Sequence, residues 1–233
     1  MIEKTAALIE AKKRQKRALM QQLLTGRKRL SGFEGEWAMV TLSQICKRLS
    51  GTAENPKDYP VLSITAGRGF VSQADKFSRI IAGKQVEKYV ILKRGEFSYN
   101  KGNSYRYPQG CVYRLSEYEE GLVPNVFYSF RLAEKRADAE FIKQYFLAGF
   151  HNRDLYRWIN SGVRNNGLLN LNAADFFKLP IQIPSLAEQK EIGEVLRHSD
   201  LEIVAIEKKQ AALKQQKKSL MQKLLTGQIR VKV

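Results

Sequence analysis

The sequence has very few residues of the kinds that bind metals or cross-link a fold. Its 233 residues include two cysteines, Cys46 and Cys111, and two histidines, His151 and His198. Two cysteines without a CxxC pair form neither a disulfide framework nor, with two histidines, a zinc constellation. The same scarcity leaves no convincing Ser/His/Asp or Cys/His catalytic set. We therefore expect a reduced, cytoplasmic protein without a metal site.

Long apolar runs and acidic residues are also scarce. No run approaches the roughly 20 apolar residues of a membrane span, and the N-terminus lacks the apolar core of a signal peptide. The chain has 40 Lys and Arg against 23 Asp and Glu, a net charge of +17. Solvated lysines on long helices explain part of this excess, but the middle of the chain is basic too. The composition favours a polyanionic partner, nucleic acid before membrane.

Motifs for independent catalysis are weak. A magnesium nuclease needs clustered carboxylates near a lysine, and neither Glu87-Lys88 nor Glu134-Lys135 has that spacing. Residues 66–70 (AGRGF) and Asn55-Pro56 are only faint echoes of the methyl-donor and target-base elements of a DNA methyltransferase. We expect the chain to be non-catalytic by itself and to bind no cofactor.

The C-terminal segment, residues 185–233, predicts one long helix. Ser185 and Glu188 have capping-box spacing, and Gly227 can close the helix. Apolar residues recur at alternating steps of four and three, which is a heptad seam. The apolar seam residues expected to pair are Ile192, Leu196, Ile203, Ile206, Leu213, Leu220 and Leu224. A helix over 187–226 is about 60 Å long and needs a partner helix to bury this seam.

The N-terminal segment, residues 1–31, supplies a matching helix over 2–25. Residues 15–26 (QKRALMQQLLTG) repeat residues 216–227 (QKKSLMQKLLTG), and an internal repeat fixes architecture. Its apolar seam residues are Ile2, Ile9, Leu19 and Leu23. The two helices should run antiparallel, and Lys12, Lys16 and Lys217 on the seam favour a specific register. The helix begins in mid-heptad, which suggests a fragment or a trimmed gene.

Residues 32–184 predict one globular domain of mixed strands and helices, so the fold class is α+β. We expect helices over 40–49 and, as a pair broken near Gly149, over 137–159. The predicted strands cover 61–65, two runs within 87–100, 110–118 and 123–132. A short helical turn and a strand complete the domain over 174–184.

Candidate nucleic-acid contacts lie in three segments. The run 98–107 supplies Tyr99, Asn100, Lys101, Asn103, Ser104, Arg106 and Tyr107. Asn suits adenine, Arg suits guanine, and Lys, Ser and Tyr suit phosphates. The alternative for this run is a polar hairpin loop with tyrosines packed beneath it. Arg68, and Arg164 with Asn165, are further candidates; an ordinary surface turn is the alternative for Arg68.

Three stretches together resemble the specificity (S) subunits of type I restriction–modification enzymes. They are residues 98–102 (SYNKG), residues 162–192 (GVRNNGLLNLNAADFFKLPIQIPSLAEQKEI) and the paired LLTG helices. The resemblance implies a non-catalytic subunit whose target-recognition domain reads one half of a split site in double-stranded DNA. It also implies spacer helices that dock methyltransferase (M) subunits, with a restriction (R) subunit joining indirectly. Methyl donor and ATP would be bound by those partners.

The chain departs from that family in having one recognition domain where an S subunit has two. It resembles a second half or a half-length S protein, so a split site needs another copy. The first helix is too short to cover the second, and we therefore expect a homodimer in which the uncovered parts of the long helices pair. The rival hypothesis is a coiled-coil adaptor whose globular domain binds protein instead of DNA.

Overall fold

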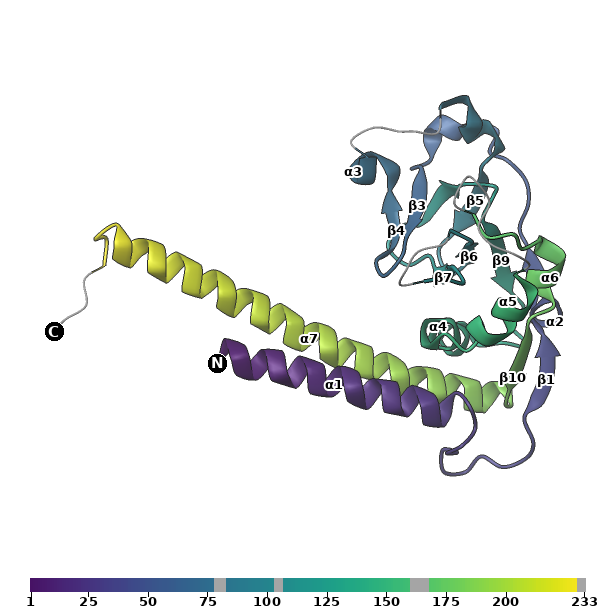
Figure 1. Ribbon diagram of the computed structural model, residues 1–233, viewed down its shortest axis with the longest axis horizontal. Coiled ribbons are helices and arrows are strands. Elements are labelled where there is room, and N and C mark those ends of the chain that lie inside the picture. The colour runs from purple at the N-terminus through teal and green to yellow at the C-terminus, as the bar shows by residue number, and fades with distance from the viewer. Residues whose placement is uncertain (78–82, 103–106, 160–167, 230–233) are drawn as a thin grey trace.

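The computed structural model of the chain describes residues 1–77, 83–102, 107–159 and 168–229. Two helices, one from each end of the chain, lie side by side as a rod that projects from a mixed domain of strands and helices (Figure 1). This confirms the predicted α+β class with two long antiparallel helices. In these described ranges, no helix is long and apolar enough to span a membrane.

The helices differ greatly in length, since α7 has 40 residues and α1 has 22. Two short 3₁₀ segments cover Pro56–Asp58 and Gly83–Lys88. The α-helices within the described ranges are α1 (Ile2–Leu23), α2 (Leu42–Ile45), α3 (Gln73–Phe77), α4 (Ala139–Ala148), α5 (Asn152–Trp158), α6 (Ala173–Phe177) and α7 (Leu186–Leu225).

The strands are β1 (Ala38–Thr41), β2 (Cys46–Arg48), β3 (Leu62–Thr65), β4 (Gly69–Ser72), β5 (Val90–Lys93), β6 (Phe97–Asn100), β7 (Cys111–Arg114), β8 (Glu120–Val123), β9 (Tyr128–Leu132) and β10 (Pro180–Ile183). A four-stranded antiparallel sheet has the order β2-β9-β6-β7. Three antiparallel pairs accompany it: β1–β10, β3–β4 and β5–β8. We call residues 38–183, from β1 to β10, the middle domain.

Two expected elements of the middle domain are wrong. The helix expected over 40–49 is replaced by β1, α2 and β2, because β1 pairs with β10, a strand distant in sequence. Leu42 and Ile45, three residues apart and both buried, imitate helical periodicity over a single turn. The strand expected over 123–132 is two strands, since the chain turns after β8, where the Phe127 N–H donates to the Pro124 carbonyl at 3.0 Å.

An aromatic core holds the sheet against the helices. The rings of Phe97 on β6 and Phe130 on β9 stack at 5.3 Å, and that of Phe176 on α6 stacks on Tyr99 at 4.5 Å. Helix α4 starts where the Asp138 carboxylate accepts from two backbone N–H groups, and it ends at the left-handed Gly149. The predicted break between two helices near Gly149 is thereby confirmed.

Candidate nucleic-acid interface and the helical rod

Arg68 stands at the tip of the β3–β4 hairpin. Its N–H donates to the Thr65 carbonyl at 3.0 Å, and Gly67 and Gly69 on either side have φ of +81° and +84°. Glycine reaches such angles without strain, so the turn can be this tight. The Gly67 N–H donates to the Tyr113 hydroxyl at 2.8 Å. The backbone of the tip is therefore braced, while the Arg68 side chain is exposed.

Asn100 fastens the end of β6 to this hairpin. Its Nδ2 donates to the Ile64 carbonyl at 3.2 Å, and its Oδ1 accepts from the Gly102 N–H at 2.8 Å. Both polar ends of the side chain therefore have partners inside the protein. Asn100 therefore positions the loop, and its contact with a base stays a prediction.

Tyr99 and Lys101 lie inside the domain. The Tyr99 hydroxyl donates to the Gln109 carbonyl at 2.8 Å, and burial raises the pKa of this tyrosine. Lys101 Nζ lies 3.2 Å from the Tyr128 hydroxyl and 5.1 Å from the centroid of the same ring. Both side chains are less than a tenth exposed, which agrees with the alternative of a tyrosine packed beneath the loop.

The run 98–107 is joined by backbone contacts to the residues that follow Arg164 and Asn165. Gly102 and Leu168 form an antiparallel bridge, and the Leu169 N–H donates to the Lys101 carbonyl at 2.9 Å. Tyr107 is half-buried and packs against the cluster under the β3–β4 hairpin. The remaining candidates fall outside the described residues: Asn103, Ser104, Arg106, Arg164 and Asn165.

The hairpin tip, the described part of the run 98–107 and the residues that follow the third candidate segment therefore meet at one place. We call it the loop end: the hairpin tip 66–68, residues 100–102 with Tyr107, and residues 168–169. Asn100 joins the first segment to the second, and the Gly102–Leu168 bridge joins the second to the third. These links join residues that are far apart in the sequence, so no local sequence pattern predicts them.

Sequence reasoning missed Arg48, an exposed residue on β2. Its guanidinium lies 5.9 Å from the centroid of Tyr128, the ring that Lys101 also approaches. Each cation lies within the distance at which a ring attracts a positive charge. The signal was the pair Lys47-Arg48, which the erroneous helix over 40–49 concealed.

The rod is closed over only part of its length. The apolar seam is buried where α1 and α7 lie together and opens toward the C-terminus (Figure 1). Ile9, Leu23, Ile192, Leu196 and Ile203 are buried; Ile2, Leu19, Ile206 and Leu213 are half-buried; Leu220 and Leu224 are exposed. The short helix thus leaves the last turns of the long one uncovered.

Ion pairs fix the antiparallel register of the rod. Lys12 Nζ lies 2.6 Å from Glu202, Lys13 Nζ 2.7 Å from Glu207, and Lys16 Nζ 2.6 Å from Asp200. Exposed pairs of this kind contribute little stability each. Together they specify one alignment, as expected for polar residues on a seam.

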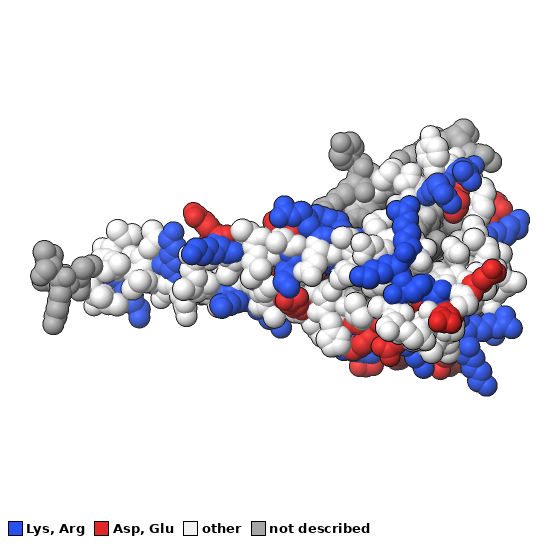
Figure 2. Space-filling view, turned by 90° about the horizontal axis from the view of Figure 1, so that it is seen from below, with Lys and Arg blue, Asp and Glu red and all other residues white. Residues whose placement is uncertain are grey.

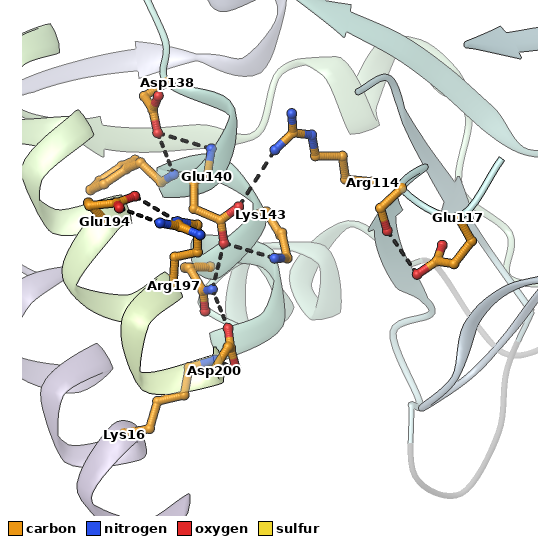
Figure 3. Close-up of polar contacts among 12 residues, drawn as sticks. Lys16, Arg114, Glu117, Asp138, Glu140, Lys143, Glu194, Arg197 and Asp200 are labelled. Carbon is orange, nitrogen blue, oxygen red and sulfur yellow. Dashed lines mark hydrogen bonds and ion pairs between the residues drawn. The ribbon is translucent and has the colours of Figure 1, made fainter. Parts of the chain in front are cut away.

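A chain of polar contacts ties the middle domain to the rod, and we call it the junction (Figure 3). Arg114 on β7 lies 3.6 Å from Glu140 on α4, and Glu140 accepts from Gln144 Nε2 at 2.9 Å. The same Nε2 donates to Asp200 on α7 at 2.8 Å, and Asp200 also accepts from Lys16 on α1. Gln144, at the centre of the junction, is fully buried, and the contacts link four elements, β7, α4, α7 and α1.

Close backbone contact reinforces the junction. Gly193 on α7 faces the start of α4, where an added Cβ would lie 3.0 Å from Asp138 Oδ1 and from the Phe141 nitrogen. Only glycine permits this approach of the two helices without displacement. The orientation of the middle domain on the rod is therefore set by packing as well as by charge.

Basic side chains outnumber acidic ones on the face of the molecule seen in Figure 2. Figure 2 shows Lys and Arg side chains spread along the rod and across the middle domain, with acidic side chains in smaller groups. Among the described residues, no group of three or more His, Cys, Asp or Glu is placed to hold a metal ion.

Comparisons with known proteins agree with this class of molecule. A family model described as the type I restriction modification DNA specificity domain matches residues 34–215. The chain therefore belongs to the type I restriction–modification DNA specificity family, whose members act as non-catalytic specificity subunits. A search of curated protein sequences finds no match.

Solved structures show the same fold at low sequence identity. The type I restriction–modification S subunit from M. genitalium matches over 96% of this chain and 56% of its own, with a TM-score of 0.60 and 15% identity. The HsdS subunit from Thermoanaerobacter tengcongensis matches over 95% and 52%, with a TM-score of 0.54 and 12% identity. The chain thus spans about half the length of the structures that it matches.

Proposed function

We propose that this chain is a half-length specificity subunit that reads one half of a split site in double-stranded DNA. The loop end carries the proposal, because Arg68 and the described parts of two further loops, residues 100–102 with Tyr107 and residues 168–169, meet there on a domain that the junction joins to the rod. A base-reading surface needs that rigidity, since hydrogen bonds to base edges depend on position. Family membership and the basic surface support the same conclusion.

The buried candidates change the expected readout. Tyr99, Asn100 and Lys101 have hydrogen-bond partners within the protein. We therefore assign base reading to Arg68, Tyr107 and the residues next to the two loops. Arg48 is an added contact. Asn103, Ser104, Arg106, Arg164 and Asn165 remain proposed contacts. Phosphate contacts would come from the surrounding lysines and arginines.

We further propose that the rod docks M subunits, which would supply the methyl-donor site, and that an R subunit with ATP joins through them. In this arrangement the chain performs no bond-breaking step. A second copy of the chain, held through the long helix, would supply the other half of the split site. Because the proposed partner is DNA, we propose the cytoplasm as the compartment.

Binding to random duplex DNA at two salt concentrations tests the proposal, with the chain alone and with its M subunit. Release of counterions makes DNA affinity fall steeply with salt, so we expect a strong salt dependence. Sequencing methylated DNA from cells with and without the gene should then show a split motif that depends on it. A salt-insensitive affinity and an unchanged methylation pattern would favour the protein-binding adaptor.

A further inference from the structure

The hairpin that carries Arg68 is a separate two-stranded unit. In the described part of the chain, β3 and β4 pair only with each other. A two-stranded hairpin is marginally stable by itself, so contacts with its surroundings must fix the place of its tip. Figure 1 shows β4 beside β7, the edge strand of the four-stranded sheet, and the two strands are in contact. Side chains of β7 can therefore hold the hairpin.

Tyr113 on β7 reaches the tip of this hairpin. Its hydroxyl accepts from the Gly67 N–H at 2.8 Å. Its ring lies 3.6 Å from the place of an added Cβ on Gly69. Gly67 and Gly69 are the chain neighbours of Arg68, so one tyrosine contacts the backbone on both sides of the arginine, on one side by a hydrogen bond and on the other by packing.

Tyr107 supports Tyr113 in this position. The two tyrosines share a hydrogen bond, and the Tyr107 hydroxyl lies 3.4 Å from the place of an added Cβ on Gly67. Both rings are half-buried and pack against the hydrophobic cluster beneath the hairpin. Burial raises the pKa of Tyr113, so its hydroxyl stays neutral and keeps these hydrogen bonds at physiological pH.

The tip and the strands of the hairpin are held by different residues. Asn100 donates to the carbonyl of Ile64, which lies within β3 opposite Phe70. That contact fixes a strand of the hairpin, before the turn begins. The Tyr113 contact is made at the turn itself, one residue from Arg68. Loss of Tyr113 would therefore free the tip and leave the strands attached.

The place of the tip matters because of what an arginine must do to read a base. Its planar fork distinguishes guanine only when two N–H groups meet the base edge together. The side chain of Arg68 is exposed, so its backbone is the part that the protein can hold in advance. A tip that is already fixed loses less conformational freedom on binding than a mobile one.

We propose that Tyr113 is a positioning residue that sets DNA specificity: its hydroxyl holds the hairpin tip so that Arg68 meets one base pair of the half-site. Tyr113 itself touches no DNA in this arrangement. The inference rests on the proposed function, because it concerns how a DNA contact is aimed. It adds a residue that lies beneath the reading surface to the residues that form it.

Tyr113→Phe tests the proposal, because it removes the hydroxyl and keeps the ring. The Gly67 N–H belongs to an exposed residue, so water can replace the hydroxyl and the variant should remain folded. The full-length chain, with its M subunit, is bound to a duplex library randomised over the site, and the bound DNA is sequenced. We expect discrimination to fall roughly tenfold at one base pair, the range for one bidentate contact. Binding to the unselected library and its salt dependence should be retained.

Two further proteins show whether Tyr113 acts through Arg68. Arg68→Ala should lose discrimination at the same base pair. The double variant Arg68→Ala/Tyr113→Phe should lose no more than Arg68→Ala alone, since coupled residues are not additive. Tyr118→Phe is the matched control, because Tyr118 is another half-buried tyrosine on the same hydrophobic cluster. It should keep the preference of the unmodified chain.

Hydrogen exchange without DNA tests the contact directly. The Gly67 amide should exchange several-fold faster in Tyr113→Phe than in the unmodified chain, while the amides of β6 keep their protection. Unchanged exchange at Gly67 would show that the hydroxyl does not hold the tip, and would overturn the inference.

The binding results separate this inference from the proposed function. Tyr113→Phe overturns the inference if it keeps the original discrimination, or if it weakens binding to all sequences alike. A double variant that loses markedly more than Arg68→Ala also overturns it. In these cases the unmodified chain still prefers a half-site, so the proposed function stands. An unmodified chain that prefers no sequence with its M subunit overturns both.

Discussion

Arg29 and Glu188 form a two-point ion pair that joins the segment after α1 to the first turn of α7. Arg29 Nε donates to Oε1 at 2.5 Å and Nη2 to Oε2 at 2.7 Å. The Glu188 pair with Arg29 raises the pKa of the arginine. Glu188 is 1% exposed. It lies in the first turn of α7, where the helix dipole also favours a negative charge.

Replacing Glu188 should loosen the base of the rod. Glu188→Ala removes the buried half of this bidentate pair, whose Arg29 side chain is 27% exposed, and with it a favourable negative charge in the first turn of α7. We expect a lower melting temperature by circular dichroism. Glu191→Ala, an exposed acidic residue one turn along α7, is the control and should change it little. Equal decreases in melting temperature for the two substitutions would show that the Arg29–Glu188 pair adds no more stability than an exposed acidic residue.

Asp200 should control how firmly α1 is held. It accepts hydrogen bonds from Lys16 and Gln144, so Asp200→Ala breaks the junction at its centre. Hydrogen exchange in α1 should become faster, while the core strand β6 stays protected. Glu194→Ala is the control, because it removes an acid that pairs with Arg197 on the same helix. It should leave hydrogen exchange in α1 unchanged. Unchanged protection of α1 in Asp200→Ala would contradict the role assigned to the junction.

His151 should make the protein sensitive to acid. Burial lowers the pKa of His151 to about 3 from an ordinary value of 6.5, and neither ring nitrogen has a partner among the described residues. The unfolded chain therefore binds a proton below about 6.5 that the folded chain excludes. Stability is complete above that pH and falls as the pH is lowered toward 3, by up to about 1.4 kcal/mol per pH unit.

The measurement is the free energy of unfolding against pH for three proteins. His151→Leu should show a shallower decline between pH 6.5 and 4 than the unmodified chain. His198→Leu, at an exposed position on α7, should decline as the unmodified chain does. Parallel curves for all three would place the acid sensitivity in other groups.

Arg68 should read bases. Arg68→Ala removes an exposed guanidinium at the loop end and should shift preference among half-sites by about 1–3 kcal/mol, the range for one bidentate contact. Arg153→Ala, which removes an exposed charge on α5, should preserve sequence preference. Asn103→Ala and Arg106→Ala are predicted to resemble Arg68→Ala. If all three kept the original preference, recognition would move to Arg164 and its loop.

The sequence was most informative about the rod. A seam repeated over many turns, an internal repeat and a closing glycine all depend on neighbours in the same helix, and the structure confirms the two antiparallel helices. The capping residue was predicted too, since the Ser185 hydroxyl accepts from the Glu188 N–H at 3.3 Å. The Glu188 carboxylate, however, binds Arg29, because a partner 159 residues away leaves no local pattern.

The candidate site was harder to predict for the same reason. The run 98–107 combines a strand end with a loop, and its polar residues look alike in sequence. Only the pairing of β6 with β7 and β9 shows that Tyr99 points into the core. Likewise, the contact of Asn100 with Ile64 depends on how two distant hairpins pack.

The pairing of β1 with β10 has a consequence for how such proteins can evolve. The chain enters and leaves the middle domain on adjacent antiparallel strands, with Ala38 opposite Ile183. Everything between them is an insertion whose two ends lie side by side, a geometry that tolerates replacement of whole domains. A new insert that keeps these strands and a helix face like that of α4 would acquire the same support. Under the proposed function, exchange of the insert at these two points would change the DNA preference and leave the rod unchanged.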